Sequence, residues 1–559
     1  TINDAAPGPF EYNPENNTWT NNSYVNIGPS FINETSGNGS TWQVADIQSG
    51  QAGSVPMSTS YGWRIVVDDT MYFTADDGIT GYELWAYNTS NGTTWQVADI
   101  NSGSSSSLFS SLDVRPMAIL VGETIYFSAN DGSSGVELWA HNTSSHSTWR
   151  VADIRSGSGD SQPGRDMYVL IGDILVFDAT DYNNGKELWT HNTATNSTSR
   201  VTQLASGSAG ISAGTYMSTV VGSRVYFDCN TGTSIGWELY AYDTTNTSAW
   251  LVADINSGSD HSIPGYMGGA VLIGDTLYFS ADDGSTGDEL WAHDTSNHST
   301  WQVADINSGA SNGLSWGTEL DGDTVIDGVI YFTATDGNTG HELWAHSTSN
   351  GTTWQVADIN SGPGNSDPMD RMGLIISGDT FYFSADDGST GRELWAHDTS
   401  NRSTWRVTDL NSGSGDGYGW TLDVIGDTLY FIGDDGSTGD ELWAYDTSNQ
   451  STWLVYDIYT GSNNSRFGDN WLKEVLVGNH LVFTADDGST GQELWAHYPS
   501  SINYQTNTGG NVTTWAINAS LPSGLSFGTN NGTIYGTPTE LWTQTSYMVW
   551  ANNSGGSSV

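Results

Sequence analysis

One short phrase recurs along this chain and constrains its fold more than any other feature. Glu-Leu-Trp, with Glu238-Leu-Tyr as a variant, returns about every 50 residues. Its copies begin at Glu83, Glu137, Glu187, Glu238, Glu289, Glu342, Glu393, Glu441 and Glu493. Variants of a second phrase, Trp-x-Val-Ala-Asp-Ile, lie between these copies and also before the first. A period of this length is typical of a propeller, a solenoid or an array.

Each unit is predicted to contain four short strands. In residues 371–411, four runs rich in β-branched and aromatic residues are separated by Asp-Gly and Ser-Asn turns. We therefore expect an all-β protein built from four-stranded antiparallel blades.

The two ends of the array distinguish a ring from an open structure. Residues 42–47 form a last strand without a unit before it, and the unit at 493–497 lacks its last strand. Pairing these two segments would complete a ninth blade and remove the exposed sheet edges. An open repeat array remains the alternative.

The repeat resembles the ELWxxDGT-repeat family over roughly residues 40–498. The matching text includes "YFSADDGSTG" followed by "ELWAHDTSNRST" and "ELWAYDTSNQST". The resemblance implies a β-propeller in a secreted or cell-surface protein, and it implies no catalytic residues. Most copies replace the family's Asp-Gly-Thr with Asp/Asn-Thr-Ser-Asn and a glycosylation sequon.

Residues 501–559 resemble the immunoglobulin-like domains of bacterial and archaeal surface proteins, on the text "LPSGLSF", "GTIYGTP" and "YMVWANNSGGSS". Family members continue with one more strand and an Asn-Asp-x-Ala-Pro ending, which the first residues, "TINDAAP", resemble. Residues 10–25 are similar to the opening strands of the same domain. We therefore expect the large propeller to be inserted into an Ig-like sandwich. The expected segments are 1–7 (donor strand and linker), 8–28 (first Ig-like strands), 29–498 (propeller) and 499–559 (remaining Ig-like strands).

A sandwich that lacks an edge strand leaves backbone groups unpaired. Thr1, Ile2, Asn3 and Asp4 of one copy are therefore the expected donor strand, and Ser557, Ser558 and Val559 of the next copy the acceptor end. This contact runs head to tail and propagates. A covalent tandem chain, in which residue 559 is followed by another residue 1, would give the same pairing.

The charge balance limits the expected partners. The chain has 64 Asp and Glu against 14 Lys and Arg, a net charge of −50, which disfavours nucleic acid and anionic membranes. No run of 18 apolar residues predicts a membrane span. The expected partners are copies of the same chain, with glycans or other surface proteins as further candidates. Cys229, the single cysteine, allows no internal disulfide and is expected to be a buried small residue.

An aspartate precedes each Glu-Leu-Trp in a Gly-rich turn. It either caps its own turn, the favoured interpretation, or binds Ca²⁺. The calcium candidates are Asp77, Asp131, Asp283, Asp336, Asp387, Asp435 and Asp487. No cofactor is required. In the degenerate copy, Thr231 replaces this aspartate and Gln203 replaces the aspartate of the second phrase. The repeated glutamate persists there, which favours a structural bond to turn N–H groups.

Asn-x-Ser/Thr sequons are abundant, and most repeats carry one in the same hairpin. They are glycosylation candidates, although Asn-x-Ser is also a good hairpin sequence. The 18 candidates are Asn16, Asn21, Asn33, Asn38, Asn88, Asn91, Asn142, Asn196, Asn246, Asn297, Asn350, Asn401, Asn449, Asn463, Asn511, Asn518, Asn531 and Asn552.

The remaining repeated residues are expected to be structural. The tryptophans of Glu-Leu-Trp should pack between blades. The histidines that follow them alternate with tyrosine, so we expect exposed strand positions rather than a zinc or acid–base site. No catalytic triad, phosphate loop or zinc spacing stands out.

The sequence thus predicts an extracellular structural protein, not an enzyme: a subunit of a surface filament or stalk of a prokaryote, with archaea among the candidate sources. The alternative is a cell-surface adhesin whose propeller binds a glycan. A propeller hydrolase would need one blade with unique titratable residues, and the departures noted above are losses.

Overall fold

The computed structural model describes most of the chain and contains only strands and turns there. The described residues are 10–13, 18–21, 39–56, 63–108, 118–202, 204–205, 210–232, 234–315, 320, 324–369, 374–465, 467, 475–499 and five short C-terminal strands. The chain divides into two compact units, Thr1–Pro499 and Ser500–Val559. In the described ranges, no helix has the length and apolarity needed to cross a membrane.

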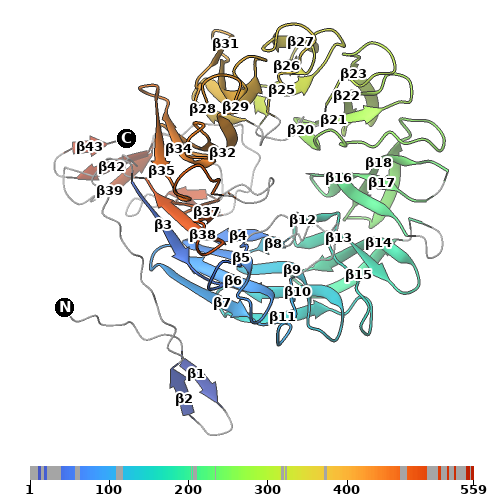
Figure 1. Cartoon of the computed structure of the whole chain (residues 1–559). Coiled ribbons are helices and arrows are strands. Elements are labelled where there is room, and N and C mark those ends of the chain that lie inside the picture. The colour runs from blue at the N-terminus through green and yellow to red at the C-terminus, as the bar shows by residue number, and fades with distance from the viewer. Residues whose placement is uncertain are drawn as a thin grey trace. The chain divides into compact units, whose positions relative to one another are not determined.

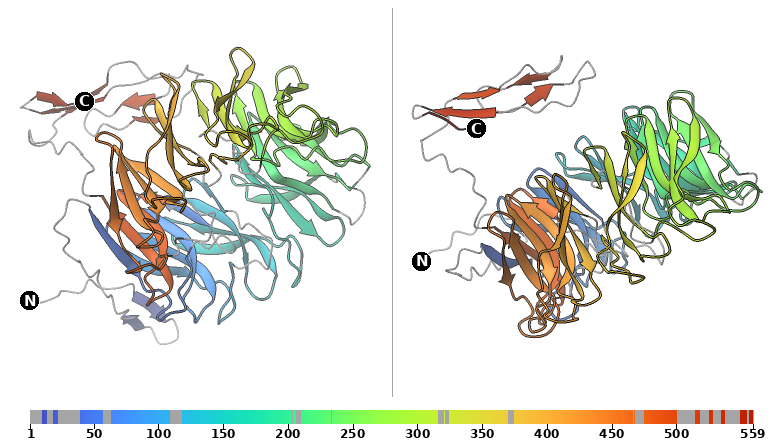
Figure 2. Two further views of the ribbon diagram at one scale, coloured as in Figure 1. Left: turned by 45° about the horizontal axis from the view of Figure 1, so that its top comes forward. Right: turned by 90° about the horizontal axis from the view of Figure 1, so that it is seen from above.

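Nine four-stranded antiparallel sheets make up a β-propeller in the first unit (Figures 1 and 2). Blade 1 is β36-β37-β38-β3, and blades 2 to 9 follow in chain order from β4-β5-β6-β7 to β32-β33-β34-β35. The first strands are β4 Arg64–Val67, β8 Ala118–Val121, β12 Tyr168–Ile171, β16 Ser212–Val221, β20 Ala270–Ile273, β24 Val325–Ile326, β28 Ile375–Ser377, β32 Tyr418–Ile425 and β36 Val475–Val477. The second strands are β5 Thr70–Asp76, β9 Thr124–Asn130, β13 Ile174–Asp181, β17 Arg224–Asn230, β21 Thr276–Asp282, β25 Val329–Ala334, β29 Thr380–Asp386, β33 Thr428–Gly433 and β37 His480–Asp486.

The third strands carry the Glu-Leu-Trp phrase, and the fourth strands carry the second phrase. The third strands are β6 Tyr82–Asn88, β10 Val136–Asn142, β14 Gly185–Asn192, β18 Trp237–Asp243, β22 Asp288–Asp294, β26 Glu342–Ser347, β30 Arg392–Asp398, β34 Glu441–Asp446 and β38 Gln492–Tyr498. The fourth strands are β7 Thr93–Ala98, β11 Ser147–Ala152, β15 Ser197–Thr202, β19 Ser248–Ala253, β23 Ser299–Ala304, β27 Thr352–Ala357, β31 Ser403–Arg406, β35 Ser451–Tyr456 and β3 Ser40–Ala45.

Blade 1 closes the ring with strands from both ends of the repeat region. β3 pairs with β38 in a ladder that runs from Ser40 opposite Tyr498 to Ala45 opposite Leu494. The predicted pairing of 42–47 with 493–497 is therefore confirmed, and the open array is excluded. This arrangement leaves every blade with two neighbours and no open end to the array.

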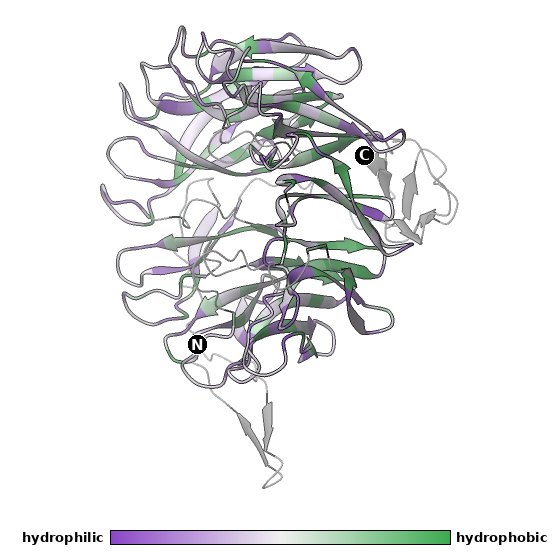
Figure 3. Ribbon diagram, turned by 90° about the vertical axis from the view of Figure 1, so that its right-hand side faces the viewer, coloured by the Kyte–Doolittle hydropathy of each residue, from purple (hydrophilic) through white to green (hydrophobic). Residues whose placement is uncertain are grey.

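The core lies between the blades, because each strand alternates between two buried faces. In blade 2, Leu84 and Ala86 pack toward blade 3, whereas Phe73 and Trp85 pack toward blade 1. Figure 3 shows apolar residues along the strands and hydrophilic residues at the loops. Burial on both faces explains why a small residue, alanine in all tryptophan-containing copies but blade 4, where it is Thr190, follows the tryptophan of the repeat.

The other strands are short. β1 (Phe10–Asn13) and β2 (Thr18–Asn21) form a two-stranded antiparallel pair. In the second unit, β39 (Thr514–Ile517), β42 (Val549–Asn553) and β43 (Gly556–Ser558) form a three-stranded sheet in that order. β40 (Leu525–Phe527) pairs with β41 (Ile534–Gly536).

Candidate functional site

A buried glutamate organises the end of every blade. Glu83 accepts the N–H groups of Ile100 (2.8 Å), Asn101 (3.4 Å) and Ser107 (3.1 Å). These residues follow a register shift between Leu84 and Trp85 of β6 and its partner strand β7, a bulge that bends the fourth strand. The glutamate thus ties the connection between two blades to the third strand, as its persistence in the degenerate copy predicted.

The same bond helps to close the ring. Glu493 of β38 accepts the N–H groups of Ile47 (3.0 Å), Gln48 (3.2 Å) and Ser54 (2.9 Å), which follow β3. The nine glutamates are fully buried, and burial raises the pKa of Glu83, Glu187, Glu238, Glu289, Glu441 and Glu493 to about 7. Their environment is structural, since each carboxylate accepts at least one backbone N–H group from the connection that follows the fourth strand.

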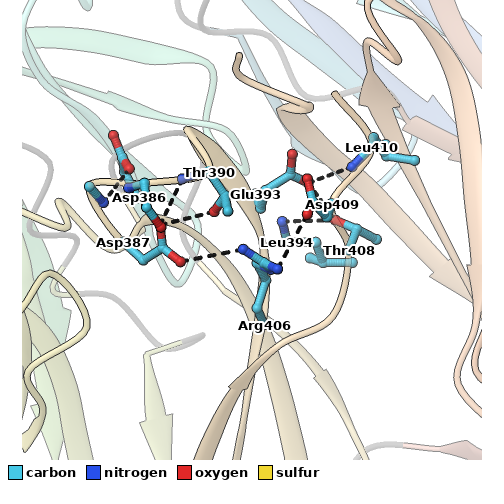
Figure 4. Close-up of polar contacts among 11 residues, drawn as sticks. Asp386, Asp387, Thr390, Glu393, Leu394, Arg406, Thr408, Asp409 and Leu410 are labelled. Carbon is cyan, nitrogen blue, oxygen red and sulfur yellow. Dashed lines mark hydrogen bonds and ion pairs between the residues drawn. The ribbon is translucent and has the colours of Figure 1, made fainter. Parts of the chain in front are cut away.

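The turn aspartates fold back on their own turns. Asp387 Oδ1 accepts the N–H groups of Ser389 (2.8 Å) and Thr390 (2.9 Å), and Oδ2 lies 3.4 Å from Arg406 of the fourth strand (Figure 4). Partial burial opposes ionisation, but these donors lower the pKa of Asp387 to about 2. Arg406 also lies 3.3 Å from Asp409 of the second phrase, so two repeated acids share one cation.

The calcium candidates all lie in such turns. Asp77, Asp131, Asp283, Asp336, Asp435 and Asp487 each accept the N–H groups two and three residues ahead, as Asp387 does. Within the described residues, no three His, Cys, Asp or Glu side chains are grouped so as to hold a metal ion. The hydrogen bonds account for these aspartates as turn caps.

The repeated histidines are buried, so the expectation of exposed positions is wrong. His141, His191, His293, His346, His397 and His497 are between 0 and 2% exposed. Each Nδ1 lies 2.8 to 2.9 Å from a threonine hydroxyl of the fourth strand. Burial lowers the pKa of His141 and His293 to about 4 and that of His497 to about 3. They are neutral packing groups at the blade interfaces.

Other structural predictions hold. The tryptophans of the phrase pack between blades; Trp85, Trp139 and Trp291 contact three different interblade clusters. Cys229 is buried and is not in a disulfide.

Blades 4 and 5 contain a titratable group that the sequence analysis missed. Asp178 and Asp228 occupy a position that holds serine or threonine in most second strands, and both are fully buried. Asp178 Oδ1 accepts two N–H groups, and its Oδ2 lies 3.3 Å from Lys186, which also pairs with Asp166. The mutual attraction raises the pKa of Lys186, against the effect of its burial.

Blade 5 repeats the acid without the lysine. Asp228 Oδ1 accepts the N–H groups of Tyr216 and Met217, whereas Oδ2 has no hydrogen-bond partner. Burial raises the pKa of Asp228 to about 7. Trp237 stands where blade 4 has Lys186, and Tyr216 stands where it has Asp166.

Three aromatic side chains, those of Tyr216, Trp237 and Tyr266, lie together next to the Tyr216 and Trp237 positions of blade 5. The ring centroid of Tyr216 lies 5.7 Å from that of Trp237 and 5.0 Å from that of Tyr266 in blade 6, and all three residues are half-buried. Departures from the repeat therefore add titratable and aromatic side chains in blades 4 and 5, as well as removing aspartates. The sequence signal for this site was the aspartate that follows phenylalanine in "FDATD" and "FDCN", where most other copies have serine or threonine.

Several predicted sites lie partly or wholly outside the described residues. Thr1, Ile2, Asn3, Asp4 and Val559 lie outside them, as does Gln203. Ser557 and Ser558 lie in β43, opposite Asn552 and Ala551 of β42. Sequons Asn16, Asn33, Asn38, Asn511, Asn518 and Asn531 also lie outside.

The comparisons with known proteins identify one domain. A family model described as "Putative Ig domain" matches residues 484–559, which supports the Ig-like interpretation of the C-terminal segment. No curated protein matches the chain.

Solved structures match the chain at low similarity. One is a puromycin-hydrolysing peptidase of Mycobacterium tuberculosis, with 10% identity over 61% of this chain and 53% of that one, TM-score 0.35. Another is dipeptidyl peptidase 4 of Porphyromonas gingivalis, with 9% identity, 73% and 60% coverage and TM-score 0.43. A third is an oligogalacturonate lyase in complex with manganese, with 9% identity, 84% and 96% coverage and TM-score 0.35.

The chain spans about half the length of the first matched peptidases. Because the matched structures include peptidases and a lyase, they contradict the expectation that this protein is not an enzyme. At this level of similarity they assign it no activity or substrate.

Proposed function

We propose that this protein is an extracellular structural protein, a subunit of a head-to-tail surface filament or stalk in which Ig-like domains form the spine and propellers project from it. The pairing of Ser40 with Tyr498 carries the proposal. The chain enters and leaves the propeller at adjacent positions of one sheet, so the whole ring fits between two segments of one Ig-like domain. The resemblance of the repeats to the ELWxxDGT family supports a surface location.

The edge of the C-terminal sheet supports assembly by strand addition. In β42, Val549 and Trp550 pair with Ile517 and Ala516 of β39. On the other side, β43 pairs only with Ala551, Asn552 and Asn553, and no described residue lies opposite Val549 and Trp550. A strand that continued β43 past Ser558 would fill these positions. Thr1–Asp4 of a second copy, joined by backbone pairing or covalently in a tandem chain, is the strand we propose.

The charge of the chain is compatible with such an array. At a net charge of −50, the propellers repel one another, and this repulsion would keep them apart along a spine.

Electron microscopy of the full-length chain at neutral pH tests the proposal. We expect beaded threads, and an Ile2→Asp substitution should abolish them because it places a charge on the face that Ile2 would share with Val559. Asn3→Asp adds the same charge on the opposite face and should leave the threads intact. Dispersed single propellers at micromolar concentration would contradict the proposal.

The aromatic group of Tyr216, Trp237 and Tyr266 favours a second candidate, an adhesin whose propeller binds a glycan. Half-buried aromatic faces are suitable for stacking on sugar rings. Glycan-array binding that is lost in Trp237→Lys, but kept in Trp301→Lys on an outer strand, would support it. An array without a signal would count against it.

A further inference from the structure

We propose that the propeller carries N-linked glycans at six outer hairpins, all on one face of the ring, and that its other described sequons stay bare. The sites are Asn91, Asn246, Asn297, Asn350, Asn401 and Asn449. The inference rests on the proposed extracellular location, because it requires a compartment that contains a glycosyltransferase.

The fold places these six residues on one face. In a four-stranded antiparallel blade, the turn between strands one and two and the hairpin between strands three and four lie at the same end. Backbone bonds join the two in the blades that carry these sequons. In blades 2 and 6, for example, Thr89 N–H donates to Asp69 O (2.9 Å) and Thr295 N–H to Asp275 O (2.8 Å). Since the blades succeed one another in a closed ring, their hairpins share one face, opposite to the aspartate turns (Figure 1).

The six asparagines share one local geometry. Each is exposed, and its Oδ1 accepts the N–H of the Ser or Thr two residues ahead at 2.9 to 3.0 Å. At Asn91, Asn246 and Asn350, Oδ1 also accepts the hydroxyl of that residue. At Asn297, Asn401 and Asn449, Nδ2 instead donates to the aspartate three residues earlier in the hairpin, at 2.6 to 2.7 Å. In all six sites the turn keeps the asparagine at the surface, where a transferase can reach it.

The remaining sequons of the blades differ either in the burial of the asparagine or in the use of the sequon hydroxyl. Asn88 and Asn142 are half-buried, and their Nδ2 groups donate to Thr70 (2.8 Å) and Thr124 (3.1 Å) within the blade. The amide nitrogen that would be modified is thus directed into the sheet.

Two further sequons have an occupied hydroxyl. For Asn196, the sequon hydroxyl is that of Thr198, which lies 2.8 Å from His191 Nδ1. For Asn463, the sequon hydroxyl belongs to Ser465, which is fully buried against Glu441. Asn463 lies in the connection that follows β35, at the aspartate-turn end of the blade.

The chemistry requires a lipid-linked glycosyl phosphate as the donor. The asparagine Nδ2 forms a bond to the anomeric carbon, the bond from that carbon to the phosphate oxygen breaks, and one amide proton leaves. The lipid phosphate is the leaving group.

Blade 3 provides an internal control. Its hairpin reads Ser145-His146-Ser147, whereas blade 6 reads Asn297-His298-Ser299 at the same positions. A Ser145→Asn substitution therefore creates the blade 6 sequence in the same fold. It should add one glycan, while Asn142 three residues earlier stays bare.

Glycopeptide mass spectrometry of the full-length secreted chain, cleaved at aspartate and glutamate, tests the map. We expect glycans at the six sites, one further glycan in Ser145→Asn, and no loss of a glycan in Asn142→Gln. Glycans at Asn88, Asn142 and Asn463 as well would show modification of the unfolded chain and overturn the proposal. Bare polypeptide from chains that still form threads would overturn it too and would leave the proposed filament standing.

Discussion

At the scale of single residues, neighbouring blades match their side chains across each interface. At seven interfaces a tyrosine of one second strand meets an aromatic residue of the next blade, which is histidine in six cases and Tyr445 in one. The Tyr430–His497 pair, with ring centroids 5.1 Å apart, closes the ring. Where the second strand has Val176 or Val482 instead, the next blade has the larger Tyr242 or Tyr87. With the exception of the Tyr382–Tyr445 pair, the choice between His and Tyr therefore follows the volume of the partner, as close packing requires.

The buried histidines contribute a loss of stability in acid, which the buried glutamates with raised pKa oppose, and His497 illustrates the histidine contribution. Its pKa is lowered from 6.5 to about 3 in the folded protein. The folded state therefore binds fewer protons than the unfolded state, and stability is lost as pH falls below 6.5. From pH 7 to pH 5 the loss from this one residue should be about 2 kcal/mol.

His497→Tyr should reduce that loss, because a Tyr382–Tyr445 pair already fills the equivalent interface. Denaturant unfolding at pH 5 and pH 7 measures it. On going from pH 7 to pH 5, the change in the free energy of unfolding should be more favourable in the variant than in the natural chain by about 2 kcal/mol. An equal loss in both proteins would contradict a buried neutral His497.

At the scale of elements, blades 4 and 5 differ in a residue that compensates a buried carboxylate: Trp237 of blade 5 stands where blade 4 has Lys186. Lys186 neutralises Asp178 in blade 4, whereas the equivalent Asp228 in blade 5 has no cation. A buried carboxylate that loses its cation is strongly destabilising, whereas removing both partners costs much less.

Lys186→Met should therefore lower the free energy of unfolding by about 3 kcal/mol at pH 8. Adding Asp178→Ser, the residue type of blade 6 at this position, should restore much of the loss. Guanidinium unfolding of the single and double variants measures the difference. Equal stability of the two variants would show that Lys186 does not compensate Asp178.

The sequence predicted the strands and their arrangement better than the burial and the partners of individual side chains. Period, strand number and ring closure could be read from it because Glu-Leu-Trp and its partner phrase recur with complementary ends. The burial of His141 could not, since an alternating strand with two buried faces resembles one with a single buried face. The pair of Lys186 and Asp178 joins two strands of one blade, and a single lysine in a repeat gives no sign of such a partner.

At the scale of the whole molecule, one ladder holds the ring together. Blade 1 combines β3 with β36, β37 and β38, which lie more than 400 residues later in the chain. Glu493 adds bonds to the segment after β3. Contacts between ends so distant in sequence are costly in loop entropy, so closure should be a late step in folding.

A disulfide at the closure should stabilise the propeller. Ser40 and Tyr498 are opposite each other in an antiparallel ladder, a spacing that cysteines can bridge. Ser40→Cys with Tyr498→Cys should raise the thermal midpoint under oxidising conditions. The cross-link should increase the free energy of unfolding by up to about 5 kcal/mol. The reduced form of the same variant is the control, and the buried Cys229 should not interfere. Identical midpoints for both forms would contradict closure at this pair.

The position of that pair also determines how the wheel would respond to a pull. Tension applied through Ser40 and Tyr498 acts on the open end of the β3–β38 ladder and separates its pairs one after another, the weakest way to load a hydrogen-bonded ribbon. A stretched thread would keep its propellers intact only if the force bypasses them and passes through the proposed Ig-like domains.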